Sequence, residues 1–305
     1  MSTQHTSKTT FVAERAPFAT VFSAYYELTK PRITYLVVFS MAVGYLLGAV
    51  NGIEWFTLLN AAIGTFLIAG GTASQNQVIE RNHDKLMKRT ETRPLPTQRI
   101  EKNKAMAFSF AMIIAGFTYM LLTVNVVAAL VSGLTTLLYL GAYTPLKRVS
   151  FSNVLIGAVP GALPPVGGWA AATGDIMHPI PWLLFAVVFL WQVPHVLAIA
   201  WLLKDDYSNA GFHMLPKNDH KFVMTGSLVL GCLVLLLPVS YGLYFYGSYS
   251  LIFLVGSLLT AAWYSWYGIL FFKKKDNPSA KKLMFSSFVY LPLVWVFLLI
   301  EVAFL

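Results

Sequence analysis

The sequence predicts an all-α membrane protein with nine transmembrane helices, and three observations lead to this prediction. Of the 305 residues, 57% are hydrophobic and only 11% are charged, whereas soluble globular proteins carry roughly 25% charged residues. The apolar residues form long unbroken runs, not the alternating pattern of an outer-membrane barrel. All 22 Lys and Arg residues fall on one side of the resulting topology. This composition excludes both a soluble enzyme and a long disordered chain.

The spans follow from length, because a transmembrane helix needs about 20 mostly apolar residues. Nine segments qualify, approximately 33–50, 55–79, 104–123, 126–144, 153–173, 180–203, 222–246, 249–272 and 283–304. The fifth is interrupted by Pro160, Pro164 and Pro165, and such breaks are tolerated where neighbouring helices or a cavity satisfy the freed backbone groups. We treat residues 1–305 as one transmembrane domain, in which residues 1–25 form a polar cytoplasmic arm.

The positions of the basic residues support the number of spans and predict their orientation in the membrane. They lie in the N-terminal arm and in the loops that follow the second, fourth, sixth and eighth spans. The opposite side carries only Glu54, Asp175 and Glu301 among charged residues. The positive-inside rule therefore predicts a multi-pass protein of the plasma membrane with a cytoplasmic N-terminus and an external C-terminus. We interpret the arm and the cluster Lys273–Lys275 as topology signals that meet anionic lipid, and expect no nucleic-acid partner.

A first polar constellation closes the second span. Asn76, Glu80 and Asp84 are spaced by four residues, so on a helix each is rotated only about 40° from the last. Oxygen ligands on one face suit Mg²⁺, which takes one or two carboxylates and completes its shell with phosphates and water. The alternative is an amphipathic cytoplasmic helix with Glu–Lys and Asp–Lys pairs at i, i+4 spacing.

Basic and aromatic residues accompany this stripe on the same side. Arg89 and Arg93 follow it and would present guanidinium groups to phosphate oxygens. Lys147 and Arg148, after the fourth span, would add further phosphate contacts. Tyr143 would either face a carbocation or belong to the interfacial aromatic belt.

A second constellation closes the sixth span. Asp205, Asp206 and Tyr207 follow it, so two acidic helix ends on one side would bind a metal–diphosphate together, with Asp206 as a metal ligand. His195 lies about two turns inside the span. Three roles stay open for it: an interhelical hydrogen bond, a proton acceptor, or an axial ligand of haem iron. His83 and His213 are interpreted as surface residues.

Several segments together resemble a known family. They are Leu28-Thr-Lys-Pro-Arg-Ile33, Asn76-Gln-Val-Ile-Glu-Arg-Asn-His-Asp84, Arg89-Thr-Glu-Thr-Arg-Pro-Leu-Pro96, Tyr143-Thr-Pro-Leu-Lys-Arg148, Trp191-Gln-Val-Pro-His195 and Asp205-Asp-Tyr-Ser-Asn-Ala-Gly-Phe-His-Met-Leu-Pro216. The chain resembles the UbiA superfamily of intramembrane prenyltransferases, and within it the branch that farnesylates haem. The resemblance covers nearly the whole chain and implies nine helices around a central cavity.

This resemblance also implies a reaction and assigns residues to it. The substrates are farnesyl diphosphate and haem b, the product is haem O, and Mg²⁺ is the cofactor. Asn76, Glu80 and Asp84 correspond to the first acidic motif, and His195 becomes an active-site residue; the remaining candidates are Arg89, Arg93, Tyr143, Lys147, Arg148, Asp205, Asp206 and Tyr207. A downstream partner, haem A synthase, follows from the same family logic.

The chain departs from the family pattern at two points. Glu80 stands where the superfamily usually has Asp, and the Asp205-Asp206 pair lacks the second carboxylate of a D-x₃-D motif. Two alternatives to haem farnesylation remain. One is a related prenyltransferase that acts on a quinone or chlorin ring, and the other is a secondary transporter, whose acids would lie deep within the spans.

Overall fold

The computed structural model describes residues 18–217, 219 and 222–304, so residues 1–17 of the predicted N-terminal arm lie outside the described part of the chain. Nine helices within this part are long and apolar enough to cross a membrane, which confirms the predicted number. The first four spans are α2 (Pro31–Gly48), α3 (Trp55–Asp84), α4 (Lys102–Thr123) and the segment Val126–Leu146. The last four are α9 (Pro179–Leu202), α11 (Val223–Gly247), α12 (Leu251–Lys274) and α13 (Asn277–Phe304).

The fifth span, between these two sets, is broken where its prolines predicted a break. It consists of α7 (Asn153–Ala162) and α8 (Pro164–Thr173), with Leu163 between them. Two short helices, α1 (Phe18–Leu28) and α10 (Lys204–Asn209), complete the part that the structure describes. The predicted span boundaries were correct to within a few residues, except that α3 runs to Asp84 and α13 begins at Asn277.

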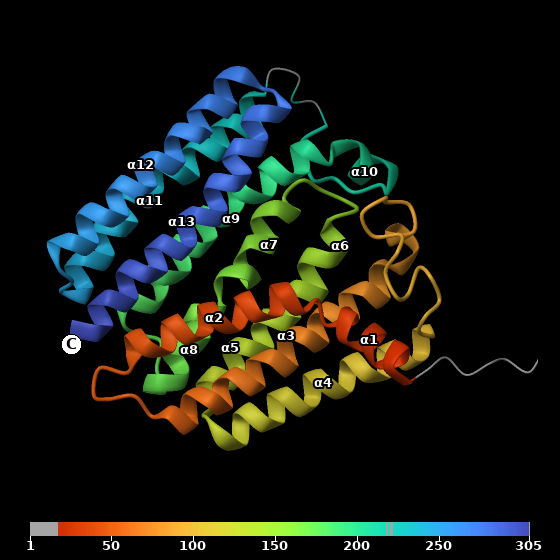
Figure 1. Ribbon diagram of the computed structural model, residues 1–305, viewed down its shortest axis with the longest axis horizontal. Coiled ribbons are helices and arrows are strands. Elements are labelled where there is room, and N and C mark those ends of the chain that lie inside the picture. The colour runs from red at the N-terminus through yellow and green to blue at the C-terminus, as the bar shows by residue number, and fades with distance from the viewer. Residues whose placement is uncertain (1–17, 218, 220–221, 305) are drawn as a thin grey trace, which may run out of the picture.

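The helices form two groups (Figure 1). In one, α3 packs along α4 and α2 packs along α8; in the other, α9, α11, α12 and α13 pack against one another. The α7 helix contacts α9 and the end of the fourth span, and so connects the groups. The α1 helix and the C-terminal end of α13 lie at opposite ends of the molecule (Figure 1), as an odd number of spans requires.

The contact between α2 and α8 depends on two glycines. A Cβ added at Gly44 would lie 1.9 Å from the backbone oxygen of Pro165, and one added at Gly168 would lie 1.8 Å from that of Met41. Small residues allow membrane helices to pack this closely. This packing fixes the broken fifth span against the first.

The fourth span changes its winding toward the end where the basic loops lie. Its α-helix, α5 (Val126–Leu137), continues as a π-helix, η1 (Leu138–Tyr143), and then as the single turn α6 (Thr144–Leu146). Such π-helical segments occur frequently at functional sites. Here the segment carries Tyr139 and Tyr143, whose ring centroids are 5.1 Å apart, and it leads directly to Lys147.

Candidate functional site

The predicted stripe on α3 is real and buried. The α3 helix continues through Asp84, so Asn76, Glu80 and Asp84 lie on successive turns of one face. Their exposed fractions are 0%, 4% and 0%. Each contacts a cation from a different part of the chain. The interpretation as a solvated amphipathic helix is therefore wrong, because the acids are buried and their partners are not on α3.

Asn76 contacts the segment that precedes the first span. Lys30 Nζ donates a hydrogen bond to Asn76 Oδ1 at 2.9 Å, and Asn76 Nδ2 donates to Thr144 Oγ1 at 3.2 Å. From the sequence, Lys30 is one of the basic residues ahead of the first span and is expected to act only as a topology signal. The structure places it in the site, with its own backbone in the left-handed conformation (φ 48°) immediately before Pro31.

Glu80 contacts the end of the fourth span. Lys147 Nζ donates to Glu80 Oε1 at 2.9 Å, and the two side chains are 12% and 5% exposed. The same ammonium group lies 4.4 Å from the centre of the Tyr143 ring. Tyr143 thus already binds a cation on its ring face, which is the property that its predicted role requires.

Asp84 contacts the loop that follows it. Arg93 Nη1 donates to both carboxylate oxygens of Asp84 at 2.9 Å. Thr90 Oγ1 donates to the backbone oxygen of Asp84 at 2.8 Å, which holds the loop against the helix end. Arg89, in contrast, is exposed, and Arg148 is exposed with Nη2 3.3 Å from the backbone oxygen of Ile79. Of the four predicted phosphate-binding residues, the structure therefore brings Arg93 and Lys147 directly onto the stripe.

The electrostatics of the three cations differ. Burial opposes the charged form of Lys147, but Tyr143 and Glu80 outweigh it and raise its pKa above the ordinary value. Burial lowers the pKa of Lys30 to about 7, and the positive charge of Arg93 adds to this effect, partly offset by Glu80. Three cations therefore share two carboxylates, and Lys30 is the one whose charge is least compensated. The excess of positive charge suits a polyanionic ligand.

The second constellation lies on the short α10 helix. Asp205 is exposed, and Asp206 and Tyr207 are half-buried. The contacts that join this region to α3 come from other residues. His83 Nδ1 is 2.9 Å from the backbone oxygen of Ala210, and the Phe212 ring lies 5.3 Å from the His83 ring and 5.8 Å from Lys147 Nζ.

His83 and His213 are partly exposed, and both pack against other segments. Both are half-buried, and the backbone amide of His213 donates to the backbone oxygen of Lys147 at 2.7 Å. Asn153 Nδ2 donates to the backbone oxygen of His213 at 2.7 Å and so ties the loop to α7. These contacts hold the loop after α10 against the stripe.

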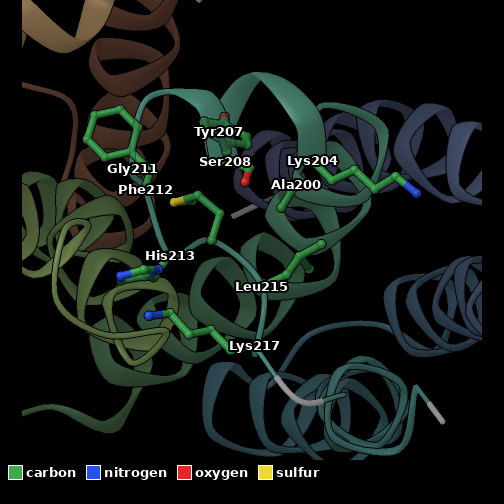
Figure 2. A pocket seen from close by; sticks show the side chains of 10 residues that line it. Ala200, Lys204, Tyr207, Ser208, Gly211, Phe212, His213, Leu215 and Lys217 are labelled. Atoms are coloured by element: carbon green, nitrogen blue, oxygen red, sulfur yellow. The ribbon is translucent and has the colours of Figure 1, made fainter. Parts of the chain in front are cut away.

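A cavity of about 250 Å³ lies beside α10. Tyr207 is the predicted site residue that lines it, together with Ser208, Phe212 and His213. Lys217 and His213 lie on the same side of the cavity; Lys204 also lines it, and the end of its side chain points away from these two residues (Figure 2). This volume is below the usual range for a pocket that holds a whole cofactor-sized ligand. The cavity is therefore an edge of the site, and a central cavity among the helices stays a prediction.

His195 lies on α9 and contacts α13. Its Nδ1 is 2.6 Å from Ser287 Oγ, and its ring stacks on Trp191 with centroids 5.3 Å apart. The edge of Phe288 completes its surroundings, at 5.0 Å between centroids. An interhelical hydrogen bond, the first of the three predicted roles, is thus present.

The oxygen donors of the stripe fit Mg²⁺. Asn76, Glu80 and Asp84 supply one amide and two carboxylates, the hard oxygen ligands that this ion takes. No group of three or more His, Cys, Asp or Glu side chains gathers into a metal cluster within residues 18–217, 219 and 222–304. A metal here would therefore depend on ligands from the substrate.

Sequence reasoning missed four residues of this region. Lys30, Thr144, Phe212 and Ser287 all contact predicted site residues. Lys30, Thr144 and Phe212 carried a signal, because they lie in the segments Leu28–Ile33, Tyr143–Arg148 and Asp205–Pro216 that contributed to the family resemblance. Ser287 lies in none of these segments, and its sequence position gives no indication of its partner.

Comparison with known proteins identifies the family. Residues 37–291 match the UbiA prenyltransferase family. The chain is 40% identical over 286 residues to a protein of Solibacter usitatus named protoheme IX farnesyltransferase, covering 91% of this chain and 98% of that protein. A protein of the same name from Cytophaga hutchinsonii is also 40% identical over 286 residues, covering 91% and 97% of the two chains.

Solved structures show the same fold at much lower identity. A digeranylgeranylglyceryl phosphate synthase superposes with a TM-score of 0.80 at 17% identity, covering 93% of this chain and 99% of that one. A UbiA homologue from Archaeoglobus fulgidus, bound to DMAPP and Mg²⁺, superposes with a TM-score of 0.65 at 13% identity, covering 90% and 99%. These likenesses confirm the predicted nine-helix architecture.

Proposed function

The chain belongs to the UbiA prenyltransferase family, and we propose that it transfers the farnesyl group of farnesyl diphosphate to a vinyl group of haem b, giving haem O and diphosphate. It is a prenyltransferase by family, and the names of relatives at 40% identity over 91% of the chain support the farnesyl donor and the haem acceptor. Membership of this family excludes the secondary transporter considered from the sequence.

One observation carries the proposal beyond these names. The buried stripe Asn76, Glu80 and Asp84 is met by Lys30, Lys147 and Arg93 from three other segments. Two carboxylates and three cations leave an excess of positive charge at one end of a membrane-spanning bundle. A metal–diphosphate headgroup matches such a site, because the metal binds the acids and the phosphate oxygens bind the bases.

Mg²⁺ would be held by Asn76, Glu80 and Asp84, with Asp206 as the predicted contribution of the second constellation. When bound, it would neutralise the diphosphate and so favour its departure. The A. fulgidus homologue bound to DMAPP and Mg²⁺ supports the choice of metal. Asp205 is proposed to assist from the same short helix.

The side chains of the protein would stabilise the leaving group. Arg93 and Lys147, which pair with Asp84 and Glu80, would bind the diphosphate oxygens as the carbon–oxygen bond breaks, with Arg89 and Arg148 further out. The Tyr143 ring, which now faces the Lys147 ammonium group, would face the allylic cation. The apolar spans would enclose the farnesyl chain and exclude water.

The acceptor steps follow from the chemistry of the product. The vinyl group of haem forms a carbon–carbon bond to the allylic cation, and the new cation on the porphyrin substituent is captured by water, which loses a proton. The result is a hydroxyethylfarnesyl group. Tyr207 is proposed to contact substrate from the edge of the site, and His195 to act at the acceptor.

The protein is a multi-pass membrane protein, and its orientation is part of the proposal. The one-sided distribution of all 22 Lys and Arg residues supports a cytoplasmic N-terminus, an external C-terminus and a plasma-membrane location. The site would then open toward the cytoplasm. The partnership with haem A synthase stays a prediction.

The test is a transfer assay with purified protein in detergent, supplied with haem b, farnesyl diphosphate and Mg²⁺, and followed by chromatography and mass spectrometry. We expect haem O from the wild-type protein and from Asp175→Asn, which changes an exposed acid at the other end of the bundle, and none from Asp84→Asn. Prenylation of a quinone or chlorin ring in place of haem would overturn the proposed acceptor. Haem O formation by Asp84→Asn at the wild-type rate would overturn the proposed diphosphate site.

A further inference from the structure

His195 is held by one residue of the last helix. Its Nδ1 is 2.6 Å from the hydroxyl oxygen of Ser287, which is fully buried on α13. The Trp191 ring, stacked on His195, donates from Nε1 to the backbone oxygen of the same Ser287 at 2.8 Å. Ser287 therefore contacts both rings, one through its side chain and the other through its backbone.

The position of one proton determines which nitrogen of His195 is basic. Ser287 Oγ lies 2.5 Å from the backbone oxygen of Met284, in the preceding turn. Two oxygens this close repel each other unless a proton lies between them, so the single hydroxyl proton of Ser287 is used in this bond. The hydroxyl oxygen can then only accept from His195. The Nδ1 atom must accordingly carry the hydrogen.

We infer that Ser287 is a positioning residue, which holds His195 as the Nδ1–H tautomer so that Nε2 is the unprotonated nitrogen available to the acceptor substrate. The identity of that substrate rests on the proposed function. The assignment of the tautomer does not, because it follows from the hydrogen bonds of Ser287. A neutral imidazole with a free Nε2 can coordinate the haem iron or accept the proton from the capturing water. The opposite tautomer would present an N–H group and could do neither from Nε2.

The neighbouring residue provides a matched control. Ser286 is also buried on α13, and its hydroxyl also donates to a carbonyl in the preceding turn, Leu283 O at 2.8 Å. Ser286→Ala thus removes the same kind of group from the same helix without a histidine partner. Ser287→Ala keeps the backbone bond to Trp191 and removes only the hydroxyl. Ser287→Thr restores a hydroxyl that can bond back along the helix.

The experiment is ¹⁵N NMR of the full chain in detergent with ¹⁵N-labelled histidine, and His195→Gln identifies the His195 signals. We expect one protonated and one unprotonated nitrogen for His195, with Nδ1 protonated, in the wild type, Ser286→Ala and Ser287→Thr. In Ser287→Ala the two tautomers should mix. Transfer activity of Ser287→Ala should fall by about 10- to 100-fold, the usual effect of losing such an orienting partner.

The NMR result separates this inference from the proposed function, because it needs no substrate. A protonated Nε2 in the wild type would overturn the inference even if haem O is formed. An unchanged His195 spectrum in Ser287→Ala would also overturn it. If Ser286→Ala lost as much activity as Ser287→Ala, the role of Ser287 would be structural. If the spectra are as expected but neither the wild type nor any variant forms haem O, the tautomer assignment stands and the proposed acceptor, haem b, is overturned.

Discussion

Lys147 and Glu80 are 67 residues apart in the chain, yet they form a buried ion pair at 2.9 Å that joins the fourth span to α3. Both side chains are largely removed from solvent, and Tyr143 covers the ammonium group. Removing one partner of such a pair leaves an uncompensated charge, which typically costs about 3–5 kcal/mol. The pair therefore contributes to both the stability of the fold and the chemistry of the site.

Lys147→Met should lower the free energy of unfolding by about 3–5 kcal/mol and abolish transfer, whereas the double variant Lys147→Met/Glu80→Gln should regain part of the stability but no activity. Thermal unfolding in detergent measures the first effect. Lys104→Met is the control, because Lys104 pairs with Glu101 in solvent (64% and 71% exposed), and its replacement should lower stability far less than that of Lys147. Equal losses for Lys147→Met and Lys104→Met would contradict the prediction.

The contribution of Lys147 to the free energy of unfolding depends on pH with a definite sign. The pKa of Lys147 is raised in the folded state, even though burial alone would lower it, because Tyr143 and Glu80 favour its charged form. Its contribution is thus complete below the unfolded pKa of about 10.4 and is lost only as pH rises through the folded pKa. The stability gap between wild type and Lys147→Met should therefore stay constant from about pH 8 to 9 and narrow as pH falls through about 7, because Lys147 opposes the protonation of the neighbouring Lys30.

Arg93→Gln should lower the turnover number and, at the same time, lower the Mg²⁺ concentration that the enzyme requires. Because Arg93 Nη1 contacts both oxygens of Asp84, it competes with Mg²⁺ for that carboxylate. Without it, the Mg²⁺ concentration for half-maximal activity should fall, while kcat falls by about 10²- to 10³-fold for lack of a diphosphate donor. Arg99→Gln, in the same loop but paired with Glu27 near the surface, should change neither. A higher Mg²⁺ requirement in Arg93→Gln would count against the competition.

The sequence was sufficient to predict the fold because hydrophobic length and charge asymmetry are local signals. Each apolar run of about 20 residues specifies a span by itself, and the basic loops order the spans. The prolines at 160, 164 and 165 likewise predicted the break at Leu163. The π-helix Leu138–Tyr143, which packs against α7, was not predictable, because its composition does not distinguish it from the α-helix that precedes it.

The site was predictable only where its spacing is local. Asn76, Glu80 and Asp84 share a face because four residues nearly complete one turn, and this requires no tertiary information. Lys30, the partner of Asn76, lies 46 residues from it in the chain, and Lys147, the partner of Glu80, lies 67 residues from it. The sequence alone could not predict either pairing. Ser287 was missed for the same reason, since it lies 92 residues from His195.

Gly44→Ala should destabilise the protein strongly, because the new Cβ would overlap the backbone oxygen of Pro165 on α8. Overpacking typically costs about 1–3 kcal/mol, and a backbone neighbour cannot move aside as a side chain does. Gly231→Ala is the control, since nothing lies within 4 Å of its added Cβ and alanine favours a helix interior by up to about 1 kcal/mol. Thermal unfolding should rank Gly231→Ala at or above wild type and Gly44→Ala well below it.

Glu301→Gln should lower stability without affecting transfer, because Glu301 caps a helix at the other end of the bundle. It is 8% exposed on α13, and its carboxylate accepts from the backbone amide of Ser250 at 2.8 Å and from the Ser250 hydroxyl at 2.5 Å, where α12 begins. Charge at a helix N-terminus and a buried charged hydrogen bond are each worth about 1–2 kcal/mol, and the neutral amide retains only part of this.

The expected result for Glu301→Gln is a lower unfolding temperature. At a temperature where both proteins are folded, its kcat and KM should lie within about twofold of the wild-type values. Ser250→Ala removes the hydroxyl but keeps the backbone amide, so Glu301→Gln/Ser250→Ala should lose less stability than the sum of the single variants. A loss of transfer in folded Glu301→Gln would mean that the α12–α13 end is coupled to the site. A direct route for that coupling is α13, the helix that carries both Glu301 and Ser287.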